Sequence, residues 1–272
     1  MVRRKVGFVG LGNMAQALLR RWIASGALPA KDVYGYDPDE SLCGSLRDSL
    51  GINVAGDNSE LALICDVIVL AVKPRYVEDA LAQLGLRLPV GDYSGKAVLS
   101  VVTGLTTAAL KERLHGAEVA RVMPNTPALV GEGVFAVSRQ HTFSEELMEW
   151  ATGLLERCGR VFFVDEGDME AVTGLSGSGP AYGFVFIEAM ADAGVRLGLS
   201  RATAYRMAAQ TLAGAGRMAL ESGQIPAAMK DAVCSPGGTT IEGVCALERG
   251  GFRASVIDAV CASAAKAAVL RG

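Results

Sequence analysis

Small residues near the start of the chain have the spacing of a loop that binds a dinucleotide. The run GLGNMA, residues 10–15, follows a short apolar stretch and precedes a helical pattern. In such a G-x-G-x-x-A turn, Gly10 allows the tight turn, Gly12 lets a pyrophosphate approach the backbone, and Ala15 allows close packing of helix on strand. The following helix would offer free N–H groups and a positive dipole end to the phosphates. This pattern predicts that the chain binds a dinucleotide.

An acidic residue follows at the distance expected for a carboxylate that binds ribose. Asp37 lies 22 residues after Ala15, at the end of the next predicted strand. A carboxylate there accepts hydrogen bonds from the 2′-hydroxyl of NAD and repels the 2′-phosphate of NADP, so the residues alone favour NADH. The alternative is that Asp37 only begins the turn at Pro38, because Asp is a strong turn and cap former.

The scarcity of histidine limits the chemistry that the bound cofactor can support. The chain has two histidines, His115 and His141, and neither lies in a Gly-rich or motif-like context. No metal-ligand cluster, P-loop or hydrolase motif is present. We therefore expect hydride transfer by the nicotinamide, with the protein supplying position and hydrogen bonds. Such a site suits an imine, because a protonated C=N bond is already electrophilic.

Three loop-like segments are candidates for contact with the substrate. Ser176–Pro180 and Ser235–Thr240 each precede a predicted helix, and their hydroxyl and N–H groups could cap that helix and bind a carboxylate. Met123–Pro127 follows a strand, at the carboxyl end where ligands bind in doubly wound sheets. Each segment could also be an ordinary turn before a helix. Two such loops in one helical region favour an anion site.

The pattern of apolar residues predicts the elements that position these groups. Strands are predicted over residues 5–9, 33–36, 67–72, 97–102 and 119–122, alternating with helical stretches that include the one begun by Met14, Leu18 and Trp22. This alternation predicts βαβ units and a parallel sheet. After about residue 165 helices alone are predicted, over residues 182–197, 201–221, 241–249 and 254–270. The fold class is therefore α/β, with an N-terminal Rossmann doubly wound sheet, residues 1–165, followed by an all-α domain, residues 166–272.

The helical region is rich in alanine. Small residues let helix axes approach closely, so this region is expected to pack against a second copy of itself. The alternative is that alanine is there only for its helix propensity.

Composition and charge exclude several classes of protein. Half of the residues are hydrophobic, which excludes intrinsic disorder. The formal net charge is -3 without a basic stripe, so we expect no nucleic-acid partner. The apolar runs are far shorter than the ~20 residues that span a bilayer, and no signal peptide is recognisable. The six cysteines are scattered. We expect a reduced, cytoplasmic protein that does not associate with membranes.

Several segments together resemble the pyrroline-5-carboxylate reductase family. They are GLGNMA (10–15), AVKP (71–74), MPNTP (123–127), SGSGPAY (176–182) and KDAVCSPGGTTIEGV (230–244). The resemblance implies reduction of 1-pyrroline-5-carboxylate to L-proline with NADPH or NADH, the final step of proline biosynthesis. It also implies a Rossmann domain followed by a helical dimerisation domain, with dimers that often assemble into rings.

The resemblance also implies the residues of the site. The cofactor-binding set is Gly10, Leu11, Gly12, Asn13, Met14, Ala15, Asn58, Ala71, Val72, Lys73, Pro74, and, near the nicotinamide, Val102 and Thr103; Asp37 joins it from its spacing. The substrate-binding set is Asn125, Ser176, Gly177, Ser178, Gly179, Val233, Ser235, Gly237, Gly238, Thr239 and Thr240. Thr240 is the expected catalytic residue, because it matches the family position that hydrogen-bonds the ring nitrogen and so orients the imine. No metal ligand is implied.

Three positions qualify the resemblance. Family members that favour NADPH tend to have small hydroxyl or basic residues in place of Asp37, and some relatives have Asn in place of Ala232. Lys73 is expected to have an electrostatic or structural role, because no partner that would lower its pKa is visible.

Two other functions stay open at this point. A related β-hydroxyacid dehydrogenase would share the GLGNM start, but it would need a lysine early in the helical region, where the first after Tyr182 is Lys230. A nonenzymatic dinucleotide-binding protein would bind the cofactor without turnover.

Overall fold

The computed structural model describes residues 3–85, 87–88 and 92–270, which form two compact units. The first unit comprises Met1–Gly177 together with Ser263–Gly272, and the second comprises Ser178–Ala262. Residues 1–2 and 271–272, at the ends of the two predicted domains, lie outside the described residues.

The first unit contains one eight-stranded sheet with the order β3-β2-β1-β4-β5-β6-β7-β8. Each neighbouring pair from β3 through β6 in this order is parallel. β7 is antiparallel to β6, and β8 is parallel to β7. The strands are β1 (Val6–Val9), β2 (Val33–Tyr36), β3 (Asn53–Val54), β4 (Val67–Leu70), β5 (Ala97–Ser100), β6 (Glu118–Met123), β7 (Gly133–Ser138) and β8 (Gly159–Val164). The predicted doubly wound sheet is thus confirmed.

Three of these strands were not among those that the sequence predicts. β3 has only two residues, which is too short for a periodic pattern. β8 is half-buried or exposed along its length, with Phe162 47% and Phe163 36% exposed, so it lacks the buried apolar run of the central strands. β7 begins at Gly133 and follows a turn rather than a crossover helix, so it lacks the βαβ context that marks the other strands.

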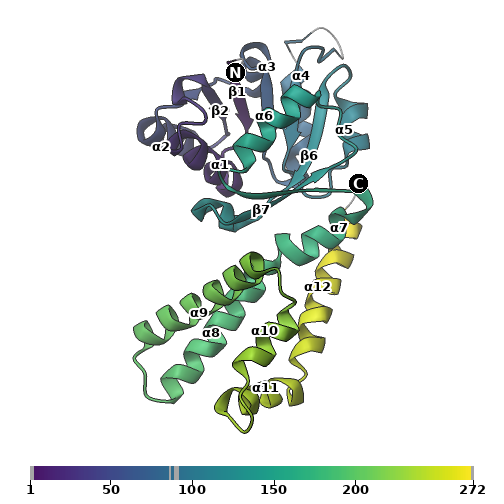
Figure 1. Cartoon of the computed structure of the whole chain (residues 1–272). Helices are drawn as coiled ribbons and strands as arrows, with labels where there is room; N and C mark the ends of the chain where they lie inside the picture. Colours follow the sequence, from purple (N-terminus) through teal and green to yellow (C-terminus); the bar gives the residue numbers. More distant parts are fainter. Residues whose placement is uncertain (1–2, 86, 89–91, 271–272) are drawn as a thin grey trace. The chain divides into compact units, whose positions relative to one another are not determined.

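Helices cover both faces of the sheet (Figure 1). α1 (Asn13–Ala24), α2 (Glu40–Leu50) and α6 (Glu145–Leu155) contribute to one apolar core. α3 (Asn58–Ile64), α4 (Val77–Gly85) and α5 (Thr107–Arg113) contribute to the other. In β4, Val67 and Val69 enter the first core while Ile68 and Leu70 enter the second. The continuous apolar run of this strand is therefore explained by burial on both faces.

The register of the sheet aligns the ends of four strands. Tyr36, Val9, Leu70 and Ser100 are the last residues of β2, β1, β4 and β5, and they pair in one row across the sheet. Arg121 of β6 continues this row as the partner of Ser100. The loops that leave these strands therefore emerge at one carboxyl edge, where ligands bind in folds of this class.

Short helical segments connect the strands of this unit. They are η1 (Ala30–Asp32), η2 (Pro74–Tyr76), η3 (Thr126–Val130) and η4 (Glu166–Asp168), followed by α7 (Met169–Val172) and the π-helical turn η5 (Thr173–Gly177).

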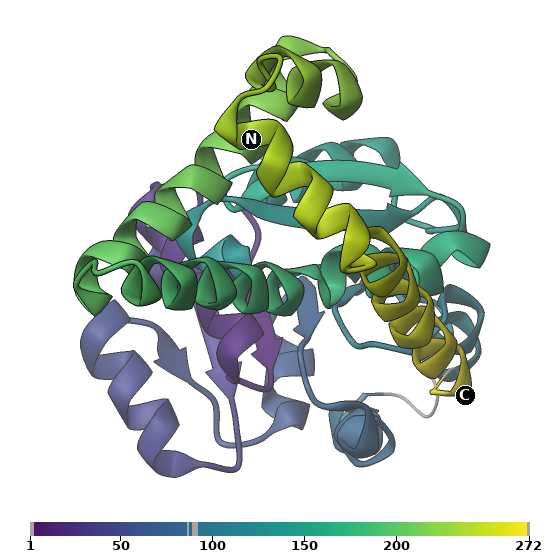
Figure 2. The same cartoon turned by 90° about the horizontal axis from the view of Figure 1, so that it is seen from below.

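The described residues of the second unit form helices without strands. They are α8 (Gly179–Arg196), α9 (Arg201–Ser222), α10 (Pro226–Val233), α11 (Thr239–Arg249) and the first part of α12 (Phe252–Val269), whose end belongs to the first unit. Figure 2 shows α8 as a long, straight helix. The four predicted helices are confirmed, and α10 is an additional one. Within the described part of the chain, no helix has both the length and the apolar composition needed to cross a membrane.

Small residues allow α8 and α9 to pack closely. A Cβ added at Gly194 of α8 would lie 3.1 Å from the Cβ of Ala204 on α9. Ala191, Ala204 and Ala208 form the small buried cluster between the two helices. Large apolar side chains of the unit, by contrast, stay exposed: Phe184 and Val185 are each 66% exposed. The unit therefore has little core of its own and presents apolar faces.

Candidate functional site

Gly10 makes the turn at the end of β1 and must be glycine for two reasons. Its φ is +89°, and a Cβ there would lie 2.9 Å from the carbonyl oxygen of Ala71. Its N–H donates to the carbonyl oxygen of Tyr36 at 2.9 Å, which ties the turn to β2. The predicted tight turn thus brings the ends of β1, β2 and β4 together.

Gly12 leaves open space at the start of α1. It is the N-cap of this helix, it is exposed, and a Cβ added there would meet no atom within 4 Å. The N-cap residue makes no side-chain hydrogen bond, and the first N–H groups of a helix have no partner within the helix. Ala15 is completely buried. The requirement for glycine at Gly12 therefore does not come from packing within the chain, and the loop fits a phosphate group.

Asp37 follows β2 and holds two backbone segments. Its Oδ2 accepts a hydrogen bond from the N–H of Leu11 at 2.9 Å, and its Oδ1 accepts one from the N–H of Asp39 at 3.1 Å. Asp37 therefore forms the predicted turn and also contacts the glycine loop, while its contact with a ribose stays a prediction. An ionised carboxylate has about four acceptor sites, so two backbone donors leave capacity for the hydroxyls of a ribose.

Asp39 adds a second negative charge beside this turn. Its carboxylate caps α2 by accepting hydrogen bonds from the N–H groups of Ser41 and Leu42. The hydrogen bond from the hydroxyl of Ser41, assisted by the backbone bond from Leu42, lowers the pKa of Asp39. Two carboxylates, those of Asp37 and Asp39, therefore follow the end of β2.

Asn58, the first residue of α3, contributes an unsatisfied polar atom after β3. The residue is 5% exposed, and its Nδ2 donates to Oε1 of Gln83 at 3.0 Å. Its Oδ1 has no hydrogen-bond partner within the described residues. Buried polar atoms normally have a partner, so this oxygen fits a hydroxyl or amide donor of a ligand.

The remaining residues predicted to bind the cofactor follow β4 and β5. Ala71, Val72 and Lys73 continue from the end of β4, and Pro74 begins η2. Val102 and Thr103 follow β5, where the N–H of Val102 donates to the Oγ of Ser100 at 3.3 Å. The structure therefore brings the predicted cofactor residues to the carboxyl edge of one sheet.

Asn125, predicted to bind the substrate, connects two backbone segments of the first unit. Its Oδ1 accepts from the N–H of Val134 at 2.8 Å, and its Nδ2 donates to the carbonyl oxygen of Ser176 at 3.0 Å. The residue is 6% exposed. The side chain thus holds the segment of Ser176 against the sheet.

The sequence predicts a loop at Ser176 and Gly177, but the structure has a helical turn there. They belong to the π-helical turn η5, and the Oγ of Ser176 donates to the carbonyl oxygen of Val172 at 3.1 Å. A Cβ at Gly177 would lie 2.6 Å from the Cε of Met123, so the methionine side chain would have to move to make room for a larger residue. The predicted capping of the next helix is wrong: Ser178 has a helical conformation and its side chain makes no cap hydrogen bond, since the turn joins α8 almost directly. π-turns are frequent at functional sites.

The other segment predicted to bind an anion has the expected geometry. The N–H of Gly238 donates to the carbonyl oxygen of Ser235 at 3.0 Å, with Pro236 next in the turn and Gly237 at a φ of +65°. Gly238 is the N-cap of α11 without a side-chain cap. The first helical residues are Thr239 and Thr240, and the exposed Val233 ends α10 just before the turn. The free N–H groups of α11 can therefore bind a carboxylate.

Neither histidine belongs to the segments named above. His115 is exposed between α5 and β6, and His141 follows β7. Burial lowers the pKa of His141, which keeps the imidazole neutral near neutral pH. In the described ranges no group of three or more His, Cys, Asp or Glu residues is arranged to hold a metal ion.

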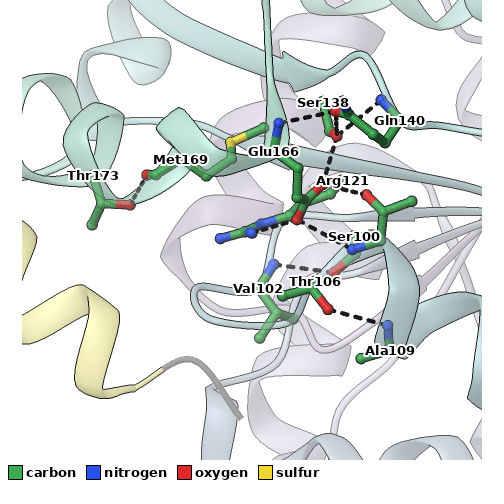
Figure 3. A network of polar contacts seen from close by, with 11 residues as sticks. Ser100, Val102, Thr106, Ala109, Arg121, Ser138, Gln140, Glu166, Met169 and Thr173 are labelled. Carbon is green, nitrogen blue, oxygen red and sulfur yellow. Dashed lines mark hydrogen bonds and ion pairs between the residues drawn. The ribbon is translucent and has the colours of Figure 1, made fainter.

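A buried ion pair near the sheet edge was not found from the sequence. Arg121 is 2% exposed, and its Nη1 lies 2.6 Å from Oε1 of Glu166 (Figure 3). Burial of the carboxyl would raise its pKa, but hydrogen bonds from Ser138, Thr107 and Arg121 together lower the pKa of Glu166 to about 2. The one available signal was an arginine within the apolar strand EVARVM.

Comparisons with known proteins agree on one family. A family model described as pyrroline-5-carboxylate reductase dimerisation matches residues 166–270, and one described as NADP oxidoreductase, coenzyme F420-dependent, matches residues 5–104. The chain is 41% identical over 244 residues to pyrroline-5-carboxylate reductase from Escherichia coli (strain K12), covering 89% of each. It is 40% identical over 240 residues to that from Arabidopsis thaliana, covering 88% of this chain and 86% of the relative. A Plasmodium falciparum pyrroline carboxylate reductase structure with NADP bound has a TM-score of 0.88 and 33% identity, with complete coverage of both chains.

Proposed function

The chain belongs to the family of pyrroline-5-carboxylate reductases, and we propose that it reduces 1-pyrroline-5-carboxylate to L-proline with NADPH or NADH, the final step of proline biosynthesis. The observation that carries this function is the segment from Lys230 to Val244, which matches the family signature and places Thr240 in the first turn of α11. The fold supports this function, because the glycine loop and the segment from Lys230 to Val244 occur together in a chain that has the family's fold.

The carboxyl edge of the first unit holds the dinucleotide in this proposal. The open N–H groups at the start of α1 bind the pyrophosphate, and Gly12 leaves the space that the phosphates need. Asp37 accepts hydrogen bonds from the adenosine ribose, and the free Oδ1 of Asn58 accepts one more from the ligand. Val102 and Thr103 lie beside the nicotinamide, and Ala71 to Pro74 contact the dinucleotide after β4. When bound, the reduced nicotinamide supplies a hydride to the imine carbon.

The second unit holds the substrate carboxylate in this proposal. The N–H groups of the first turn of α11 face the anion, because Gly238 leaves them uncapped. Thr240 hydrogen-bonds the ring nitrogen and orients the C=N bond, while the proton that completes the amine comes from water or the protonated imine itself. A threonine hydroxyl is too weak an acid for more than this. The full proposed substrate set is Asn125, Ser176, Gly177, Ser178, Gly179, Val233, Ser235, Gly237, Gly238, Thr239 and Thr240.

We propose that this chain works better with NADH than with NADPH. The Plasmodium falciparum structure contains NADP. In this chain the carboxylates of Asp37 and Asp39 both lie at the end of β2, and Asp37 is bonded to the glycine loop itself. A 2′-phosphate would approach both charges.

The chain self-associates, as its match to a dimerisation family model shows. We propose a homodimer that assembles further into a ring of dimers. The exposed apolar side chains of α8 support a partner surface, because monomeric proteins rarely expose large contiguous apolar patches.

The boundary between a dinucleotide-binding domain, residues 1–165, and a helical domain, residues 166–272, is also a proposal. The family match over residues 166–270 supports it.

A cytoplasmic location is supported by the six cysteines, all of them free.

Steady-state kinetics with both cofactors test the function. We expect consumption of NADH and, more slowly, of NADPH in the presence of 1-pyrroline-5-carboxylate. Absence of turnover with either cofactor would contradict the proposal. Turnover of a hydroxy acid instead would favour a β-hydroxyacid dehydrogenase, and cofactor binding without any turnover would favour a nonenzymatic dinucleotide-binding protein.

A further inference from the structure

The carboxylate of Glu166 connects three elements of the first unit. It lies in η4, just after β8, and its Oε1 accepts from Nη1 of Arg121 at 2.6 Å. Its Oε2 accepts from Oγ1 of Thr107 at 2.7 Å and from Oγ of Ser138 at 2.5 Å. Figure 3 shows Arg121 and Ser138 directed toward this carboxylate from neighbouring strands. The start of α5, the middle of β6 and the end of β7 are therefore held by one side chain.

The position of this cluster in the sheet relates it to the proposed cofactor site. Arg121 pairs with Ser100, and Ser100 belongs to the row in which β1, β2, β4 and β5 end. The cluster therefore lies at the same carboxyl edge as the glycine loop, on the β5 and β6 side of it.

Burying charge is costly, so the charged side chains of this cluster need partners at hydrogen-bonding distance. Arg121 is 2% exposed and the side chain of Glu166 is 15% exposed, so neither charge is well solvated. A buried guanidinium requires a paired and hydrogen-bonded partner, and removing one partner of a buried pair leaves the other charge uncompensated. The two hydroxyls complete the hydrogen bonding of the carboxylate.

The cluster is continuous with both sides of the proposed site. On one side, Thr107 is the first residue of α5 and ends the loop that contains Val102 and Thr103. On the other side, the chain runs from Glu166 through the fully buried Met169 to the π-turn, where Asn125 binds the carbonyl oxygen of Ser176. Thr103 and Gly177 both approach Met123, which brings these two sides together within the first unit.

We propose that Glu166 is a positioning residue for the reductase reaction. It fixes the loop that carries Val102 and Thr103 relative to the segment that carries Ser176 and Gly177, and it does so through Thr107, Arg121 and Ser138. This inference rests on the proposed function, because these four site residues are themselves assigned there.

The experiment compares Glu166→Gln with a matched control, Asp32→Asn. Asp32 is 2% exposed and pairs with Arg3, but it precedes β2 and so lies at the amino edge of the sheet. Both variants leave an arginine without its carboxylate. We measure kcat, KM, thermal stability and the dissociation constant of ADP-ribose, a probe that contacts the glycine loop and lacks the nicotinamide.

We expect E166Q to lower kcat by about tenfold while the dissociation constant of ADP-ribose stays within about twofold of wild type. We expect D32N to lower thermal stability with kcat unchanged. Equal loss of kcat in both variants, or an unchanged kcat in E166Q, would overturn the inference.

Two further measurements keep the test decisive. If E166Q does not fold, Thr107→Val carries the test, because it removes one hydrogen bond to Glu166 and leaves the ion pair intact. It should lower kcat with little change in thermal stability, and an unchanged kcat would overturn the inference. Wild-type protein that shows no turnover would instead contradict the proposed function, which separates the two failures.

Discussion

Asp37 and Asn125, both predicted to contact a ligand, each use a side chain to organise the backbone. Asp37 accepts hydrogen bonds from the N–H groups of Leu11 and Asp39, so it shapes the glycine loop in addition to its predicted role in binding ribose. Asn125 uses both ends of its amide on backbone groups of Val134 and Ser176. Substitution of either residue will therefore change loop geometry together with ligand contacts.

Replacing Asp37 tests the proposed preference for NADH. We expect Asp37→Ser to raise the ratio of kcat/KM for NADPH over NADH about tenfold or more, because it removes a charge that repels the 2′-phosphate. Steady-state kinetics with both cofactors measure this. Asp39→Ser is the comparison, since serine also caps a helix and the carboxylate bonded to Leu11 remains, so this variant should raise the ratio less than Asp37→Ser. An unchanged ratio in D37S would leave Asp37 with a turn-forming role alone.

Replacing Thr240 tests the proposed orientation of the imine. Thr240→Ala should raise the barrier by about 1–3 kcal/mol, the range for losing one polar contact at a buried site, seen as a lower kcat/KM. Thr211→Ala removes another helical hydroxyl, which bonds the carbonyl oxygen of Met207 on α9, and should leave the kinetics unchanged. Wild-type kinetics in T240A would remove Thr240 from this role.

The helices of the second unit differ in kind from those around the sheet. α1 buries five residues, including Leu18 and Trp22, whereas α8 buries only Ala191 although it is longer. The side chains of Phe184 and Val185 on α8 remain two-thirds exposed. Because such helices gain little from packing within one chain, they are expected to be stabilised by the second copy.

A charge on α8 should therefore weaken self-association. We expect Phe184→Glu to shift the protein from dimer or larger assembly toward monomer, since burying an unpaired carboxylate costs several kcal/mol. Light scattering over a concentration series measures the mass. Leu63→Glu, at a residue of α3 that is 51% exposed, is the control and should leave the mass unchanged. The same mass in F184E and wild type would contradict this surface.

One ion pair joins distant segments of the first unit. Glu166 and Arg121 are 45 residues apart in the chain and meet because β6, β7 and η4 lie side by side. The low pKa of Glu166 means that folding favours its ionised form. The stability of the first unit is thereby linked to pH in the acid range.

Acid unfolding measures this link. Because the pKa of Glu166 falls from 4.5 to about 2 on folding, its contribution is fully present above about pH 4.5 and is lost as the pH falls toward 2. The free energy of unfolding should therefore decline over this range, by roughly 3 kcal/mol for this group. Denaturant titrations at several pH values should show a smaller decline in E166Q. Equal slopes in the two proteins would show that Glu166 is not the linked group.

Local patterns were sufficient to predict much of this protein. The G-x-G-x-x-A spacing, the apolar runs of β1, β4 and β5, and the Gly-rich turn before α11 each depend on neighbours within a few residues. Steric rules for glycine and burial on both faces of a parallel sheet act over such distances, so these elements could be predicted. β7, β8 and α10 lacked such a pattern.

The Glu166 cluster, the two backbone bonds of Asn125 and the π-turn at Ser176 depend on residues that are distant in sequence. A carboxylate meets Arg121, and an amide meets the carbonyl of Ser176, only after the strands have taken their order. The loss of the predicted cap at Ser178 has the same origin, because the chain continues as a helix where packing holds it. Patterns of neighbouring residues thus established the fold class, the cofactor loop and the family, whereas the supports of the site arose from long-range packing that no local pattern encodes.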